Sequence, residues 1–447
     1  MNIGHFNAER SVPRYTSYPT APHFTPAIGP DRYVSWLADL PSHATLSLYL
    51  HVPYCTAICN YCGCHTKAVR RKEPLDRYAG RLLREIGMVG QATSARRVVH
   101  LHWGGGTPSI LGEGQIGRIA DRIAEIFDLS ELREHAFELD PRHVTASLAK
   151  ALAANGVDRA SLGAQDFSPR VQQAIGRIQP FDSVAAAVAT LRDAGIERIN
   201  LDLMYGLPFQ SVEDIRRNAA LAASLHPQRV AIFGYAHVPW LKANQRLIDQ
   251  GALPGASERI AQAQAAADTL VQHGYVPIGL DHFAKPNDDL AVAMRAGRLQ
   301  RNFQGYTTDT ADALIGLGAS AIGRLPQGFA QNAPDMAAYS RMLDAGGFAT
   351  AKGLALSPDD RMRGQIIERL MCDMSVDLGA IDLPDSMHAV DFSSELDSLV
   401  PLARDGIVQI AGRRVTMTEQ GRPFVRLVAA AFDGYLASSR ARHSIAV

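Results

Sequence analysis

The sequence predicts an α/β protein: a partial (β/α)6, TIM-like barrel with an N-terminal arm and a mostly helical, winged-helix-like C-terminal domain. Two observations lead to this class. Between residues 45 and 274, short apolar segments typical of buried strands alternate six times with segments of helical periodicity, which is the pattern of parallel strands joined by crossover helices. After about residue 320 the alternation stops, and helical patterns with one hairpin follow. We therefore expect an arm over residues 1–40, a barrel over 41–350 and a helical domain over 351–447.

The six strand–helix units can be followed in order. The first strand is "TLSLYLHV" at 45–52, and the first helix covers 74–86, where Leu75, Tyr78 and Leu82 recur at helical spacing after Pro74. The later strands are expected at 97–103, 135–140, 159–164, 198–206 and 229–236, and the later helices at 115–127, 144–156, 182–195, 211–225 and 258–274. Ser211 and Asp214 resemble a capping box. Six such units also fit an open doubly wound sheet, but no GxGxxG follows the first strand, which weakens a dinucleotide-binding interpretation.

The C-terminal part has its own pattern. Helices are expected at 359–374, 394–406 and 421–436, with a hairpin over 407–418. Helices with a hairpin resemble a winged-helix module, which can bind nucleic acid. We favour a lid or packing domain, because the segment lacks a dense basic stripe. Cys372 stands alone in the first of these helices and is expected to be a small buried hydrophobic residue.

Composition excludes several classes of protein. The chain has 447 residues, with 45 basic and 45 acidic side chains and a formal net charge of zero, so neither a nucleic acid nor another polyanion is suggested as a partner. No run of about 20 apolar residues occurs, so no membrane span is expected. The N-terminus lacks the apolar segment of a signal peptide. We therefore expect a cytoplasmic protein, and in that compartment clustered cysteines more often form a metal or redox site than disulfides.

Four of the five cysteines, Cys55, Cys59, Cys62 and Cys64, fall within ten positions directly after the first strand. In a parallel barrel, the chemistry lies at the carboxyl ends of the strands. A zinc ribbon would need a second CxxC pair, which the sequence lacks. A cubane iron–sulfur cluster suits three thiolates from one short loop, because its irons lie on separate corners. Three protein ligands would leave one iron open.

At this point the residues resemble a known family. Cys-x3-Cys-x2-Cys, with Tyr61 before the third cysteine, is similar to the signature of radical S-adenosylmethionine (SAM) enzymes. "HWGGGTP" at 102–108 looks like the glycine motif of that superfamily, and glycine lets a cofactor approach the backbone. The stretches "RYTSYPTAPHF", "CNYCGC", "FELDPR", "LGAQDF", "INLDLMYGLP", "YAHVP", "DHFAKP" and "NFQGYTT" resemble, in order, the oxygen-independent coproporphyrinogen III oxidases. This resemblance covers nearly the whole chain from about residue 13. The arm and the "CGC" sequence are where haem-chaperone relatives look different.

The resemblance implies a set of site residues. Cys55, Cys59 and Cys62 would hold a 4Fe–4S cluster whose open iron binds SAM, and two SAM molecules are expected. Cys64 would not be a ligand; a role near the substrate and a plain buried thiol remain equally open. The positions that match cofactor contacts of the family are Tyr49, Tyr61, Gly105, Gly106, Thr107, Glu138, Gln165, Arg177, Asp202, Phe233, Ala236 and Ile322. Carboxylates at strand ends can bind ribose or ammonium groups, and an arginine can pair with a carboxylate.

The resemblance also implies a reaction. A 5′-deoxyadenosyl radical would abstract a β-hydrogen from a propionate of coproporphyrinogen III, and loss of carbon dioxide and one electron would leave a vinyl group. Two rounds would give protoporphyrinogen IX. Arg14 and Arg301 are candidates for binding the propionates. The family further suggests a monomer and a reducing protein of the flavodoxin or ferredoxin type.

Two alternatives remain open. The chain could be a haem chaperone or a haem-modifying relative of the same superfamily, although Cys64, the arm and "NFQGYTT" argue against this. It could also be a non-catalytic zinc or iron–sulfur regulator that binds DNA through its C-terminal domain. Decarboxylation of coproporphyrinogen III would exclude the first alternative, and metal content would address the second.

Overall fold

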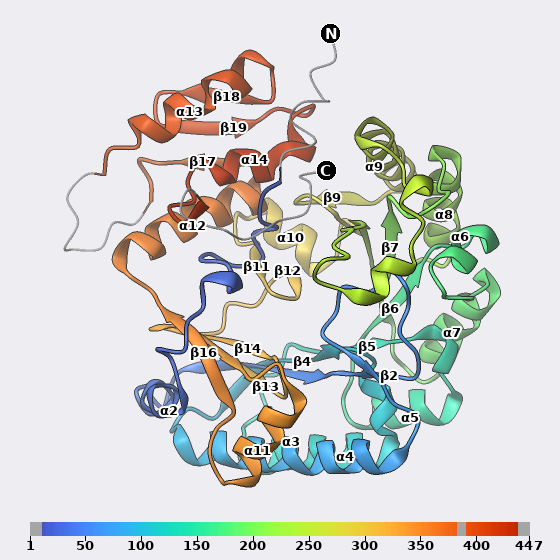
Figure 1. Ribbon diagram of the computed structural model, residues 1–447, viewed down its shortest axis with the longest axis vertical. Coiled ribbons are helices and arrows are strands. Elements are labelled where there is room, and N and C mark those ends of the chain that lie inside the picture. Colours follow the sequence, from blue (N-terminus) through green and yellow to red (C-terminus); the bar gives the residue numbers. More distant parts are fainter. Residues whose placement is uncertain (1–10, 382–389, 437–447) are drawn as a thin grey trace.

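The computed structural model describes residues 11–381 and 390–436. Within them, the largest sheet has twelve strands in the order β16-β15-β14-β13-β1-β4-β5-β6-β7-β8-β10-β9. Each neighbouring pair from β13 to β8 is parallel. The two edge strands, β16 and β9, do not pair with each other, so the sheet does not close. The predicted partial barrel is confirmed (Figure 1).

All six predicted strand–helix units are present. The parallel strands are β1 (Thr45–Val52), β4 (Arg97–Gly105), β5 (Glu134–Leu139), β6 (Arg159–Gln165), β7 (Arg198–Tyr205), β8 (Arg229–Gly234) and β13 (Ala313–Leu317). The helices between β1 and β9 are α3 (Lys72–Ala92), α4 (Glu113–Ile126), α5 (Ala146–Ala154), α6 (Pro169–Ala174), α7 (Phe181–Asp193), α8 (Val212–Ser224) and α9 (Ala256–Gln272). Ser211 and Asp214 do form a capping box. The seventh parallel strand, β13, was not predicted, because five residues are too few to show a period.

Antiparallel strands extend the sheet at both edges, and the sequence did not reveal them either. They are β14 (Ile322–Leu325), β15 (Gly328–Asn332) and β16 (Thr350–Ala355) beyond β13, and β10 (His282–Ala284) and β9 (Val276–Ile278) beyond β8. Helix α10 (Asp289–Arg295), the hairpin β11 (Gln300–Asn302) with β12 (Gly305–Thr307) and helix α11 (Met336–Asp344) lie between them along the chain. β16 carries the barrel sheet on to Ala355.

The main core lies between the sheet and its helices. Leu46, Leu48 and Leu50 on one face of β1 and Ser47 and His51 on the other are all buried, as expected for a central parallel strand with both faces covered. The rings of Trp103 and Phe137, on neighbouring strands, stack with centroids 5.4 Å apart. This packing fixes the positions of the strand ends that carry the site.

The C-terminal region forms a second core. It consists of α12 (Pro358–Asp373), β17 (Ser375–Asp377), α13 (Ser393–Arg404), β18 (Val408–Ala411), β19 (Arg414–Met417) and α14 (Val425–Ala430). The expected first helix and the hairpin are confirmed, and Cys372 is buried as predicted. The expected helix over 421–436 is wrong in extent: it reduces to a 3-10 turn, Arg422–Phe424, and the short α14. Asp433 accepts from the backbone N–H of Tyr435, and such local bonds compete with a helix.

The N-terminal arm crosses from one core to the other. Val12, Tyr15 and Tyr18 belong to the C-terminal core, and Tyr15 Oη donates to Asp433 Oδ2 at 3.0 Å. After a 3-10 turn (Ala21–His23), the helix α2 (Pro30–Ala38) packs on the barrel through Trp36. Within the described ranges, no helix combines the length and the apolar character needed to cross a bilayer.

Candidate active site

The clustered cysteines lie in the loop after β1, at the carboxyl end of the parallel strands. Cys55 belongs to the short strand β2 (Tyr54–Cys55), which pairs with β3 (Lys67–Ala68). The hydroxyl groups of Thr66 and Thr107 donate to Cys55 Sγ at 3.3 and 3.4 Å. The loop is therefore closed on itself and anchored to the segment that follows β4. This is the end of the barrel at which catalysis is expected.

A second segment holds the loop from outside. In the 3-10 turn Ala243–Leu247, Asn244 Nδ2 donates to the carbonyl oxygens of Cys59, Asn60 and Cys62 at 3.1, 3.2 and 3.0 Å. Gln245 Nε2 donates to the Tyr61 carbonyl at 2.8 Å. These two amides bond four carbonyl groups of the loop, of which Cys59 also accepts from the backbone N–H of Cys62, and so fix the backbone that carries the thiols. Lys242 Nζ completes the set by donating to the Cys64 carbonyl at 3.0 Å.

The thiols themselves differ in environment. All five cysteines are free; Cys59 is buried, Cys55 and Cys62 are half-buried, and Cys64 is exposed. A hydrogen bond from Cys64 lowers the pKa of Cys62 to about 6, and burial raises the pKa of Cys55. Among the described residues, no three His, Cys, Asp or Glu side chains converge as ligands of a single metal ion. Thiolates that bind different irons of one cubane need no such convergence.

The glycine motif packs against this loop. A Cβ on Gly106 would lie 2.5 Å from the Tyr54 carbonyl oxygen, and one on Gly104 would lie 2.8 Å from the Glu138 carboxyl group. Gly105 has φ of +109°, and its N–H donates to Glu138 Oε2 at 3.0 Å. The protein's own packing therefore demands glycine here, in addition to the predicted approach of a cofactor.

A cavity of about 200 Å³ lies inside the barrel. Glu138 near the end of β5, Asp202 in the middle of β7 and Phe233 line it, and Glu134, Arg159 and Arg229 line it from the strand starts. Glu138 Oε1 lies 3.2 Å from His102 Nε2. Burial works against the ionisation of Glu138, but the contacts with His102 and the Gly105 N–H lower its pKa below the usual value. Burial and the charge of Glu138 raise the pKa of Asp202 to about 6. The two carboxyl groups therefore have pKa values shifted in opposite directions, although both line the same cavity.

Gln165 and Arg177 lie beside the cysteine loop. Gln165 ends β6 with φ of +63°, an uncommon conformation for a non-glycine residue that often occurs at functional sites. Arg177 is buried; its Nη1 lies 3.3 Å from Asp140 Oδ2 and 3.7 Å from Cys59 Sγ, and its Nη2 donates to the Gly163 carbonyl at 2.9 Å. The guanidinium group therefore has its position fixed by the protein before any ligand binds.

The remaining predicted cofactor residues occur at the same end of the sheet. Tyr49 Oη lies 3.0 Å from His51 Nδ1, and Tyr61 packs on a small apolar cluster next to the loop. Ala236 follows β8. Ile322 begins β14, which is antiparallel to β13, so it too lies near the carboxyl ends of the parallel strands.

The two predicted substrate arginines approach each other from different parts of the chain. Arg14 Nη2 donates to the Gly234 carbonyl at the end of β8, at 2.8 Å. Arg301 Nε donates to the Tyr15 carbonyl of the arm at 3.1 Å. Burial would raise the pKa of Asp281, but its hydrogen bond with His282 and the charges of Arg301 and Arg14 hold that pKa at about 2. Both cations therefore act on the same carboxylate.

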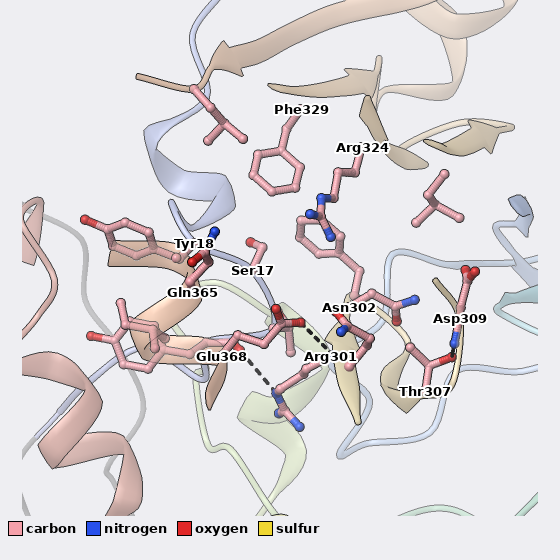
Figure 2. Close-up of a pocket in the computed structure, with 18 of the residues that line it drawn as sticks. Ser17, Tyr18, Arg301, Asn302, Thr307, Asp309, Arg324, Phe329, Gln365 and Glu368 are labelled. Carbon is pink, nitrogen blue, oxygen red and sulfur yellow. Dashed lines mark hydrogen bonds between the residues drawn. The ribbon is translucent and has the colours of Figure 1, made fainter. Parts of the chain in front are cut away.

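Arg301 also lines a pocket of about 240 Å³ between the arm, β11, β15 and α12. Figure 2 shows Ser17 and Tyr18 of the arm on one side of this pocket and Asn302 and Arg324 on another. The backbone N–H of Arg301 donates to Glu368 Oε1 at 3.1 Å. The arm thus forms part of the wall of this pocket.

Several residues of the site were not found by sequence reasoning. Asn244, Gln245 and Lys242 hold the cysteine loop, His102 contacts Glu138, and Asp281 faces the arginines. The only local signal was the position of His102 as the first residue of the "HWGGGTP" stretch. For the others, the partners lie far apart along the chain.

Comparisons with known proteins agree with this geometry. The family model of the radical SAM superfamily matches residues 49–222. The oxygen-independent coproporphyrinogen III oxidase of Bradyrhizobium diazoefficiens is 48% identical over 444 residues, which cover 98% of each chain. The oxidase of the same name from Paracoccus denitrificans is 43% identical and covers 97% of this chain and 96% of its own.

A solved structure gives the same result. Coproporphyrinogen III oxidase from Escherichia coli, described as a radical SAM enzyme, superposes with a TM-score of 0.90 at 36% identity. The match covers 96% of this chain and 100% of that chain. The similarity therefore includes the arm, the barrel and the C-terminal region together.

Proposed function

This chain belongs to the oxygen-independent coproporphyrinogen III oxidases of the radical SAM superfamily, and we propose that it converts two propionate side chains of coproporphyrinogen III into vinyl groups. In each round, a propionate β-carbon loses a hydrogen atom, the carboxylate leaves as carbon dioxide, and one electron passes to an acceptor. Two rounds yield protoporphyrinogen IX. The observation that carries the proposal is a grouping of three elements: the three thiols after β1, the carboxylates of Glu138 and Asp202 in the barrel cavity, and the two arginines around Asp281.

The cysteine loop fits a 4Fe–4S cluster. Cys55, Cys59 and Cys62 match the Cys-x3-Cys-x2-Cys signature and would be the ligands. Asn244 fixes the backbone of two of them, Cys59 and Cys62. When bound, the cluster and SAM supply a 5′-deoxyadenosyl radical, and the chemistry belongs to the cofactors. Cys64 is exposed, and we propose that it acts near the substrate and is not a ligand. Arg177, directed at Cys59, adds positive charge next to the thiolates.

The cavity between the strand ends fits adenosyl cofactors. Glu138 and Asp202 can accept hydrogen bonds from ribose or hold an ammonium group, and Phe233 offers an apolar wall. We propose two SAM molecules. The first would bind near Tyr61, Gly105, Gly106, Thr107 and Gln165.

Arg14 and Arg301 would bind propionates of the substrate. Among the described residues, Arg301 Nη1 is buried without a hydrogen-bond partner, and a buried donor of this kind is costly unless a ligand or water satisfies it. Arg14 donates to the Gly234 backbone carbonyl. Because both belong to or contact the arm, substrate binding would also order the arm over the opening and limit access of water and oxygen.

Anaerobic turnover tests the proposed function. Reconstituted protein should hold about four irons and four sulfides per chain, and with SAM, a chemical reductant and coproporphyrinogen III it should release carbon dioxide and a two-vinyl product. Zinc in place of iron would support the regulator, and haem binding without decarboxylation would support a chaperone. Either result would contradict the proposal.

Arg14→Ala tests the substrate arginines. We expect the KM for coproporphyrinogen III to rise about ten- to hundredfold, because a charged hydrogen bond contributes about 1.5–3 kcal/mol, while iron content stays constant. Arg32→Ala, an exposed arginine on α2, is the matched control. An unchanged KM in Arg14→Ala would remove Arg14 from the substrate site.

The remaining expectations belong to the same proposal. We place the reaction in the cytoplasm, in a monomer that takes its electrons from a flavodoxin- or ferredoxin-type protein. The free cysteines are consistent with a reducing compartment.

A further inference from the structure

We propose that the outer surface of the cysteine loop, formed by residues 54–72 and 238–248, is the docking site of a small acidic protein that delivers single electrons. We call this surface the electron-entry face. The inference rests on the proposed function, because it assumes that a 4Fe–4S cluster forms on the loop. It adds a location and a recognition chemistry that the family assignment does not contain.

The first argument is position. The amide of Asn244 contacts the carbonyl oxygens of Cys59 and Cys62, two of the three expected ligands. Only one layer of chain, the turn Ala243–Leu247, therefore separates these two ligands from the outside. In Figure 1 this yellow-green segment after β8 lies beside the blue loop after β1. A carrier seated on the turn would be close to the cluster without entering the cavity that the substrate needs.

The second argument is exposed apolar surface. Leu241 and Leu247 are 72% and 71% exposed, more than any other large apolar side chain of the described residues. They flank Asn244 and Gln245, which face inward to the loop. Single exposed apolar residues are common, but two within seven residues of chain, one before the turn and one at its end, form the kind of apolar centre that protein interfaces use. Nothing in the contacts of the turn with the cysteine loop requires leucine at these two positions.

The third argument is charge. Segments 54–72 and 238–248 contain six cations and no aspartate or glutamate, and the exposed Glu73 and Asp249 follow them directly. The six cations are Lys67, Arg70, Arg71, Lys72, Lys242 and Arg246. Lys67 and Lys242 come from different segments but act on one residue: after burial, their charges are the main causes that lower the pKa of His65. The carboxylate of Asp335, which lies outside the two segments, acts in the opposite direction and raises the pKa of His65.

The basic charge and the exposed leucines indicate which kind of protein binds the electron-entry face. A basic face with an apolar centre attracts an acidic protein and speeds its association at low salt. The same charge opposes docking of a second copy of this chain through this face. Electron-transfer complexes are small and short-lived, so a face of this size suffices. In the step itself, the carrier loses one electron and the oxidised cluster gains it, and no covalent bond changes.

The test compares two routes of reduction in the reconstituted holoenzyme. Leu241→Glu with Leu247→Glu should slow reduction of the cluster by a flavodoxin hydroquinone at least tenfold, followed by the change in cluster absorbance. Reduction by a photochemically generated deazaflavin radical, which needs no docking, should be unchanged. Val271→Glu, 48% exposed on the last turn of α9, is the matched control and should behave like the wild type. Calorimetric titration with oxidised flavodoxin should show at least a tenfold higher Kd for the double variant.

Charge reversal gives an independent measure. Lys67→Glu with Arg246→Glu should weaken the dependence of the flavodoxin rate on ionic strength. Equal rates and equal Kd values in wild type and both double variants would overturn the proposal. So would sedimentation data in which the leucine variant dissociates a dimer, because the face would then join two copies. Turnover with deazaflavin reports on the proposed function alone, so a failure there is distinguishable from a failure of docking.

Discussion

The two ends of the barrel both bury charged side chains, but they use them differently. At the amino end, Glu134 on β5 accepts from Arg159 on β6 at 2.7 Å and from Arg198 on β7 at 3.1 Å. Arg229 on β8 lies 3.7 Å away and also pairs with Asp288 at 2.8 Å. Although burial would raise it, the pKa of Glu134 is held well below its usual range by these three arginines. Each charged group named here therefore has an oppositely charged partner in the protein, although Arg159 Nη1 and Nη2 and Arg229 Nη2 have no hydrogen-bond partner among the described residues.

Further along the same strands, toward the carboxyl end, Glu138 and Asp202 are not neutralised in this way. Glu138 is four residues along the same strand, and its ion-pair partner among the described residues is His102. Asp202 accepts from Ser161 and Asn200, which carry no charge. We conclude that buried charge alone does not identify a site. Strand-end groups that the protein leaves without a strong counter-charge are the ones available to a ligand.

The largest expected effect lies at the carboxyl end. Cys62→Ala should remove bound iron and sulfide and reduce decarboxylation to background, because a cluster with two protein ligands is not retained. Its unfolding midpoint without metal should change little, since Cys62 is half-buried. Iron analysis and carbon dioxide release provide the measurement.

Cys372→Ala is the control for loss of a thiol. Cys372 lies on α12 in the barrel-edge cluster of Ile278 and Tyr306, so its loss should affect packing but not iron content. If Cys62→Ala kept its full iron content and activity, the assignment of the three ligands would be wrong.

The next largest effect is expected at the amino end, where a substitution should lower stability and leave iron content unchanged. Glu134→Ala should destabilise the fold by about 3–5 kcal/mol, because it leaves buried arginines without their shared partner. The folded fraction should keep its iron content, because Glu134 does not contact the cysteine loop. Urea unfolding measures the change. Glu131→Ala, which removes the exposed partner of Arg97, should cost at most about 1 kcal/mol.

Equal stability of the two glutamate variants would contradict the proposed contrast between the barrel ends. It would mean that the buried network contributes no more than a surface pair. A loss of cofactor binding in Glu134→Ala, measured under conditions where the chain is folded, would likewise show that the amino end belongs to the site.

A smaller effect tests how the loop is fixed. Gly106→Ala should destabilise the protein by about 1–3 kcal/mol and lower iron retention, because its Cβ would lie 2.5 Å from a backbone carbonyl. The control is Gly114→Ala on α4, where a Cβ meets nothing within 4 Å and where alanine should stabilise the helix by about 0.5–1 kcal/mol. Iron retained at the wild-type level in Gly106→Ala would show that the loop can shift without losing its ligands.

The same contrast explains what the sequence could predict. The six strand–helix units, the capping box of Ser211 and the grouping of Cys55, Cys59 and Cys62 are encoded by residues close together in the chain. The bonds that fix the site are not. Asn244 reaches a carbonyl 182 residues away, and β13 pairs with a strand some 270 residues before it. Such partners leave no local period or spacing, so only the folded chain reveals them.

Asp202 gives the smallest effect, and the sign of its pH dependence follows from its raised pKa. With a pKa of about 6 in the folded protein and about 3.9 when unfolded, Asp202 binds a proton more tightly in the native state. Stability from this group therefore increases as pH falls through 6, and is lost as pH rises above it. Between pH 7 and pH 5 the gain should be about 1.3 kcal/mol for the protein without cofactors.

Asp202→Asn should remove that part of the pH dependence and make the protein without cofactors more stable at pH 7 than the wild type. Urea unfolding at pH 5 and pH 7 measures the pH dependence and the stability at pH 7. The wild-type difference between the two pH values is the reference. Asp166 and Glu85 also have raised pKa values, of about 6 and 7, but they contribute equally to both proteins. Identical pH profiles would show that Asp202 has a counter-charge that neutralises it, as Glu134 has. A stabilising loss of charge at the carboxyl end, beside a destabilising one at the amino end, is what distinguishes a binding site from a structural network on the same strands.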